Sequence, residues 1–262
     1  MTSPPLLPGA EELAVDAGPV GVLLSHGFTG MPSSMRPWAE QVAAAGHSVR
    51  LPLLPGHGTS WKHMNTTTWP DWYRAVEASF RELTERCEQV FVFGLSMGAT
   101  LVTKVAEDHP GEVAGLVLVN PSFGTRRFDT RFARFLAPVV SSRPGIGSDI
   151  KSGSLEGGYD RTPLRAFVSL QQLWRVVTPE LSRITAPIRL FTSREDHVVD
   201  SLSVELLRAG ATNTTIEQSW LENSYHVATL DNDAPEIFAG SLAFVDAHTV
   251  SHGVAPEPGA GS

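Results

Sequence analysis

One short stretch constrains this chain more than any other: an apolar, strand-like run at residues 90–93 leads directly into Gly94-Leu95-Ser96-Met97-Gly98 and then into helix-forming residues. A sharp turn between a strand and a helix holds a serine hydroxyl out of the chain, where a base can reach it. The simpler alternative is a glycine-containing loop with an ordinary serine, because patterns of this length recur by chance. The strand before the motif and the helix after it favour the first interpretation, a nucleophile elbow.

The size and charge of the chain limit its ligands. It has 262 residues, of which 42% are hydrophobic, so it can bury a sizeable core. Its formal net charge is -8 and it contains no run of Lys or Arg, whereas nucleic acids and anionic membranes attract clustered positive charge. We therefore expect no nucleic-acid partner, and a ligand that is small and neutral.

Cysteine content and the absence of a long apolar run suggest a compartment. A single cysteine, Cys87, cannot form an internal disulfide, which fits a reducing environment. The first residues lack the basic start and apolar stretch of a signal peptide, and no apolar run approaches the ~20 residues of a membrane span. The sequence predicts a cytoplasmic protein, without stable membrane insertion, that is a monomer or homodimer.

Short apolar runs recur between longer helix-like segments, as in a parallel sheet covered by helices. We expect a single α/β domain over residues 1–250, with a mostly parallel central sheet, an inserted cap at about 121–178, and a disordered tail at 251–262. The helix expected at 69–86 places Trp72, Val76, Phe80 and Leu83 on one face. The expected strands are 20–24, 48–54, 90–93, 116–119, 188–192 and 215–220.

A serine nucleophile needs a base, and in α/β hydrolases the base follows the acid along the chain. His226 lies just past the last expected strand and before a helix expected at about 235–249, so it is the best candidate. His26 precedes the loop expected to donate to the oxyanion, and His197 adjoins an acid, so we expect supporting roles for both. The other histidines have simpler explanations as surface or structural residues.

The acid and the oxyanion donors can be placed in the same way. Asp196 follows the expected strand 188–192, so its carboxylate belongs to the carboxyl end of the sheet, with Glu195 and Asp200 as competitors. The oxyanion of the reaction needs N–H donors, and the residue after the nucleophile, Met97, supplies one. Phe28, in the loop after the first long strand, would supply the second.

Chemistries that depend on a cofactor are disfavoured. The sequence has neither a Walker motif nor Gly-x-Gly-x-x-Gly. Its histidines and Cys87 do not fall at metal-ligand spacing. We expect no cofactor and no metal.

Five blocks of the sequence stand out together: His26-Gly27-Phe28-Thr29-Gly30, Pro55-Gly56-His57-Gly58, the elbow, Glu195-Asp196-His197-Val198-Val199, and residues 223–231. Over about residues 20–245 the chain resembles the bacterial monoacylglycerol lipases and related carboxylesterases. The resemblance implies an α/β-hydrolase fold, a triad of Ser96, Asp196 and His226, oxyanion donors at Phe28 and Met97, and a cap over an acyl tunnel. It also implies that Ile146 and Glu156 contact the glycerol group of the substrate.

Two classes of function follow from these patterns. The first is a serine esterase that cleaves monoacylglycerols, or short and medium acyl esters, through an acyl-enzyme; transfer of the acyl group to an acceptor other than water would use the same triad. The second is a ligand-binding protein on a hydrolase scaffold that has lost its triad. The intact set of residues favours the enzyme.

Overall fold

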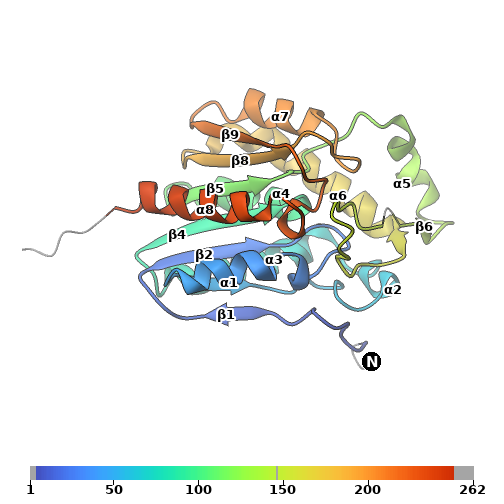
Figure 1. Cartoon of the computed structure of the whole chain (residues 1–262). Helices are drawn as coiled ribbons and strands as arrows, with labels where there is room; N and C mark the ends of the chain where they lie inside the picture. The colour runs from blue at the N-terminus through green and yellow to red at the C-terminus, as the bar shows by residue number, and fades with distance from the viewer. Residues whose placement is uncertain (1–3, 146, 251–262) are drawn as a thin grey trace, which may run out of the picture.

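The computed structural model describes residues 4–145 and 147–250 (Figure 1). The expected tail at 251–262 and the candidate Ile146 lie outside the described residues. Within the described ranges, no helix combines the length and the apolar character needed to cross a membrane.

The centre of the molecule is a seven-stranded sheet in the order β1-β3-β2-β4-β5-β8-β9. Every pairing in it is parallel except that of β1 with β3, so the expected mostly parallel sheet is confirmed. The edge strand β1 was not expected, because only three half-exposed residues form it and they carry no long apolar run. The strands are β1 Leu13–Val15, β2 Val20–Ser25, β3 Ser48–Leu51, β4 Gln89–Leu95, β5 Val113–Val119, β8 Ile188–Ser193 and β9 Ile216–Leu221.

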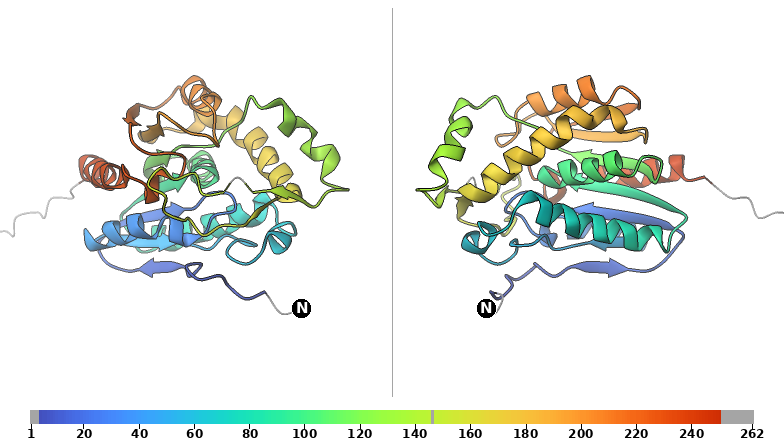
Figure 2. Two further views of the ribbon diagram at one scale, coloured as in Figure 1. Left: turned by 45° about the vertical axis from the view of Figure 1, so that its right-hand side comes forward. Right: turned by 180° about the vertical axis from the view of Figure 1, so that it is seen from behind.

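Helices cover both faces of this sheet, which explains why its strands are apolar on both sides (Figure 2). The alternation is clear in β4: Val90 and Val92 pack with α3, α4 and α6, while Phe91 and Phe93 pack with α1 and α8. The helices are α1 Arg36–Ala44, α2 Trp61–Met64, α3 Trp69–Thr84, α4 Met97–Asp108, α5 Ala133–Leu136, α6 Leu164–Val177, α7 Leu202–Gly210 and α8 Ala234–His248, with 3-10 turns η1 Pro32–Ser34, η2 Phe128–Phe132, η3 Thr178–Arg183 and η4 Ala228–Leu230.

The start and the buried face of helix α3 follow from its local sequence. Thr68 and Asp71 form a capping box at its start, and the apolar face expected from the sequence is buried as predicted. The helix ends at Thr84, two residues before the expected end. That face fixes α3 against the sheet beside the elbow helix α4.

The segment between β5 and β8 leaves the sheet and returns to it. It contains η2, α5, a two-stranded antiparallel sheet of β6 Ser142–Pro144 and β7 Arg161–Pro163, and α6. Helix α6 buries Leu170, Leu173 and Val177 in the core it shares with α4, whereas Phe135 of α5 is largely exposed. In Figure 1, α5 and β6 stand out from the layers of sheet and helix. We call residues 121–178 the insertion.

Candidate active site

Ser96 occupies the turn between β4 and α4, and its backbone has the unusual angles φ 56° and ψ -118°. A non-glycine residue in this region is strained, and such strain is concentrated at functional turns. The two flanking glycines are required by space. A Cβ on Gly98 would lie 2.0 Å from the carbonyl oxygen of Ser25, and one on Gly94 would lie 2.5 Å from the backbone of Ala99. The expected elbow is therefore present.

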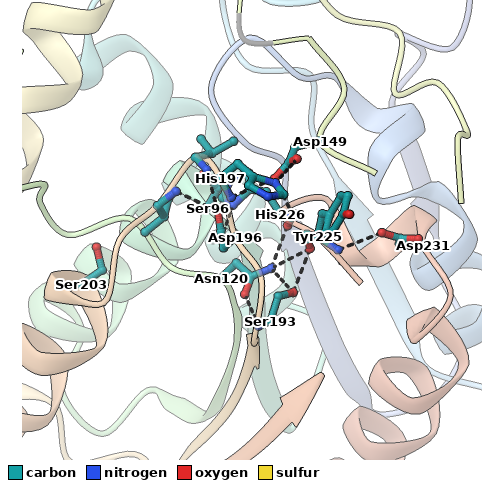
Figure 3. A network of polar contacts seen from close by, with 12 residues as sticks. Ser96, Asn120, Asp149, Ser193, Asp196, His197, Ser203, Tyr225, His226 and Asp231 are labelled. Carbon is teal, nitrogen blue, oxygen red and sulfur yellow. Dashed lines mark hydrogen bonds and ion pairs between the residues drawn. The ribbon is translucent and has the colours of Figure 1, made fainter. Parts of the chain in front are cut away.

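Three predicted residues meet at the carboxyl end of the sheet (Figure 3). The Ser96 hydroxyl lies 2.9 Å from Nε2 of His226, and Nδ1 of the same ring lies 2.7 Å from Oδ2 of Asp196. Ser96 follows β4, Asp196 follows β8 and His226 follows β9, so the ends of parallel strands bring them together. The order serine, acid, histidine is the one expected from the sequence.

The surroundings of the pair His226 and Asp196 fix its protonation. Burial alone would raise the pKa of the Asp196 carboxyl, but the charge and hydrogen bond of His226 and the N–H groups of Val198 and Val199 hold that pKa below 3.8. Burial disfavours the protonated form of His226, yet the charge and hydrogen bond of Asp196 raise the pKa of the imidazole above 6.5. An ionised Asp196 accepts a hydrogen bond from Nδ1–H, which leaves Nε2 free to take a proton from Ser96.

The two competing acids are engaged elsewhere. Glu195 is an exposed residue whose carboxylate lies 3.7 Å from Lys151. Asp200 accepts hydrogen bonds from the Thr125 hydroxyl and from the N–H of Leu202 at the start of α7. Neither carboxylate contacts His226 among the described interactions, so the geometry favours Asp196.

The two expected oxyanion donors flank the serine. Met97 begins α4, so its N–H has no acceptor within the helix, and Phe28 follows Gly27, where a Cβ would lie 3.3 Å from Cβ of Ser96. Within the described ranges, no hydrogen bond engages either N–H. Both groups are available to an oxygen atom bound beside Ser96.

Asn120, which the sequence analysis did not single out, supports the site. The Asn120 side chain accepts a hydrogen bond from the N–H of Ser193 and donates to the carbonyl oxygen of His226, at 2.8 Å in each case. Asn120 thereby links the ends of β5 and β8 to the loop that carries His226. A polar residue directly after an apolar strand was the available signal for Asn120.

The two supporting histidines differ in their environment. His26 is buried, and its Nδ1 lies 3.0 Å from the carbonyl oxygen of Gly27 while Nε2 accepts from the N–H of Leu54. Burial lowers the pKa of His26 to about 4, so the ring is neutral and joins two loops beside the serine. His197 is exposed and pairs with Asp149 of the insertion at 2.8 Å.

A cavity of about 600 Å³ opens above Ser96 and His226. Apolar side chains form much of its wall, among them Phe28, Leu164, Phe167 and Trp174. The cavity is large enough for the chain of an acyl ester.

Glu156 of the insertion lines this cavity. Its Oε1 lies close to Gly30, where a Cβ would be 2.7 Å away, and no described residue donates a hydrogen bond to the carboxylate. Burial raises the pKa of Glu156 to about 6, and the nearby His226 opposes that rise. The sequence-based expectation that Glu156 faces the substrate stays a prediction, and its position in the cavity is compatible with it.

Comparisons with known proteins agree with this fold. The sequence profile described as "Alpha/beta hydrolase family" matches residues 22–241. The chain is 42% identical over 251 residues to a protein named thermostable monoacylglycerol lipase from Bacillus sp. (strain H-257), covering 93% of this chain and 97% of that protein. It is 24% identical to a carboxylesterase of Bacillus subtilis (strain 168), over 87% of this chain and 93% of the relative.

Solved structures show the same architecture. A chain described in a study of LipS and LipT, two metagenome-derived lipolytic enzymes, matches with a TM-score of 0.90 and 43% identity, over 93% of this chain and 100% of the other. The monoacylglycerol lipase of Paleococcus ferrophilus matches with a TM-score of 0.72 and 19% identity, over 91% of this chain and all of that one, which shows a shared fold. The expected α/β-hydrolase fold is confirmed.

Proposed function

Because the chain belongs to the alpha/beta hydrolase family, we propose that it is a serine hydrolase that cleaves monoacylglycerols into fatty acid and glycerol. The observation that carries the proposal is the line of hydrogen bonds from Asp196 through His226 to Ser96. Such a line converts an ordinary hydroxyl into a nucleophile.

The reaction follows from the geometry. His226 Nε2 takes the proton of the Ser96 hydroxyl as its oxygen attacks the ester carbon, and the N–H groups of Phe28 and Met97 stabilise the negative oxygen that forms. His226 then gives the proton to the departing glycerol oxygen, which leaves the acyl group on Ser96. A water molecule, deprotonated by His226, then attacks the acyl-enzyme, and His226 returns that proton to the Ser96 oxygen as the fatty acid leaves.

Three observations support a monoacylglycerol as the substrate. The cavity has apolar walls that can hold an acyl chain. Glu156 places a carboxyl group near His226, where it can accept hydrogen bonds from the free hydroxyls of glycerol. The relative that is 42% identical is named a monoacylglycerol lipase. In this proposal residues 121–178 act as a cap that covers the acyl chain, and residues 1–250 form one domain.

The runner-up is a general carboxylesterase, or an acyltransferase, that uses the same triad. The name of the carboxylesterase from Bacillus subtilis favours the first of these alternatives. A ligand-binding protein without catalysis fits poorly, because His226 lies within hydrogen-bonding distance of both Ser96 and Asp196. We further propose a cytoplasmic monomer or homodimer without a nucleic-acid partner, in keeping with the net charge of -8 and the single cysteine.

A panel of monoacylglycerols, triacylglycerols and p-nitrophenyl esters of graded chain length tests the proposal. Monoacylglycerols should give the highest kcat/KM, and an organophosphonate should label the wild type at Ser96 but leave Ser96→Ala unlabelled. Equal turnover of p-nitrophenyl esters and monoacylglycerols would favour the general carboxylesterase. Labelling without turnover of any ester would contradict the assignment of an esterase.

A further inference from the structure

Asp149 lies in the insertion but reaches the loops of both the candidate acid and the candidate base (Figure 3). Its side chain is 12% exposed. One carboxylate oxygen, Oδ2, accepts hydrogen bonds from the backbone N–H of His226, at 3.1 Å, and from the backbone N–H of His197, at 3.2 Å. The other oxygen lies 2.8 Å from the imidazole of His197.

The two N–H groups are informative because of their place in the chain. One belongs to the base itself, and the other belongs to the peptide unit that joins Asp196 to His197. A single oxygen atom therefore connects the backbone of the loop after β8 to that of the loop after β9. We propose that Asp149 is a positioning residue that fixes the place of the candidate base relative to the candidate acid. The distance between these two groups then depends on the insertion.

The backbone around Asp149 is fixed firmly enough for this role. Its carbonyl oxygen accepts from the N–H of Val227 at 3.1 Å. Two residues further on, the N–H groups of Lys151 and Ser152 donate to the carboxylate of Asp231, which also accepts from the N–H of Tyr225. The side chain between them, Ile150, is buried with the core residues of the loop that carries His226.

The same carboxylate also acts on His226 through its charge. The charged groups that face this imidazole are Asp196, Glu156 and Asp149, and all three favour its protonated form. Asp149 itself faces the imidazole of His197, whose pKa it raises. Beyond His197, Lys151 lies over the ring of Tyr225 and pairs with the exposed Glu195. Loss of the Asp149 charge should therefore lower the pKa of His226.

The inference rests on the proposed esterase function, and two substitutions separate its parts. Asp149→Asn keeps an oxygen that can accept from both N–H groups but removes the charge, whereas Asp149→Ala removes both. Glu195→Gln is the matched control, because it removes an exposed carboxylate from the same region without touching His226. For each protein, kcat is expressed per site titrated with an organophosphonate, and the pH profile of kcat/KM is measured with a p-nitrophenyl ester.

We expect Asp149→Ala to lower kcat by roughly 10- to 100-fold with a smaller change in KM, since small displacements of reacting groups are costly. Asp149→Asn should recover most of this kcat and move the acidic limb of the profile to lower pH. Glu195→Gln should behave as the wild type. The proposal is overturned if kcat per site in Asp149→Ala equals that of the wild type. It is also overturned if the acidic limb of the Asp149→Asn profile does not move. The second measurement decides the question if Asp149→Ala does not fold. An inactive wild type, in contrast, would contradict the proposed function itself.

Discussion

Two carboxyl groups approach His226, that of Asp196 from the end of the sheet and that of Glu156 from the insertion, and their surroundings shift the two pKa values in opposite directions. On the sheet side, Asp196 accepts hydrogen bonds from His226, Val198 and Val199, and its pKa is lowered. On the side of the insertion, the half-buried Glu156 has no hydrogen-bond donor for its carboxylate among the described residues, and desolvation raises its pKa to about 6. Desolvation acts on both groups, so the charge of His226 at 2.7 Å from Asp196 and the hydrogen bonds that Asp196 accepts make the difference.

This contrast separates two tasks. A carboxylate that must orient a base needs fixed donors of its own, and the loops at the ends of β8 and β9 provide them. A carboxyl group that must receive a polar substrate group has to keep its acceptor positions free until the substrate arrives. We infer that the sheet side carries the chemistry and the insertion carries the recognition of the alcohol.

The largest expected effect tests the sheet side. Asp196→Asn should lower kcat by roughly 10⁴-fold, because an amide no longer holds the imidazole in the tautomer that accepts the Ser96 proton. His226→Ala should lose at least as much. Steady-state kinetics with a p-nitrophenyl ester, together with circular dichroism to verify folding, measures both. If Glu195→Gln or Asp200→Asn lost as much activity as Asp196→Asn, the acid would have to be reassigned.

A smaller and more selective effect tests the insertion side. Glu156→Ala should reduce kcat/KM for monoacylglycerols by roughly 10- to 100-fold, in line with the loss of about 1.5 to 3 kcal/mol for a hydrogen bond to a charged group. Esters of p-nitrophenol lack the free hydroxyls and should be hydrolysed nearly as before.

Glu156→Gln keeps one acceptor oxygen and serves as the intermediate variant. Parallel losses on both substrate classes, or none on either, would indicate a general carboxylesterase in which Glu156 has no part in recognition.

The pH dependence of activity distinguishes the two carboxyl groups further. The pKa of His226 is raised above 6.5 by Asp196, so the imidazole is protonated and inactive as a base below that raised value. We expect kcat/KM to rise about tenfold per pH unit on the acidic limb and to level off above the pKa of His226. A flat profile between about pH 5 and pH 9 would argue against His226 as the base.

The same measurement with monoacylglycerols should include the ionisation of Glu156 near pH 6. Because the ionised carboxylate accepts hydrogen bonds better than the neutral acid, this profile should fall more steeply below pH 6 than that of the p-nitrophenyl esters. Identical profiles would remove Glu156 from the recognition of the alcohol.

The smallest effect is expected on the outer part of the insertion. Phe135 of α5 is 62% exposed and does not line the cavity. Phe135→Ser should change the free energy of unfolding by about 0.5 kcal/mol or less and leave turnover of a soluble p-nitrophenyl ester unchanged. Chemical denaturation and initial rates measure these quantities. A large loss of activity would extend the functional part of the insertion beyond the cavity wall.

The sequence was most informative where local pattern and chemistry coincide. The elbow could be read from Gly94, Ser96 and Gly98, since only this spacing of small residues allows the strained turn that the structure contains. The same reasoning placed His226 and Asp196 after their strands. It did not identify Asp149, nor Asn120 with its polar side chain directly after an apolar strand, because the hydrogen-bond partners of both residues lie on distant segments of the chain.

The sequence by itself determined the alternation of strands and helices, the buried face of α3 and the order of the candidate triad, because these depend on periodicity and on position along the chain. Tertiary structure decided which of Glu195, Asp196 and Asp200 reaches the imidazole, and which carboxyl groups find donors. The side chains of one loop are only a few positions apart in the sequence, so their positions alone do not say which of them reaches a partner. A hydrogen bond depends on the direction of each side chain, and packing between segments far apart in the chain sets that direction.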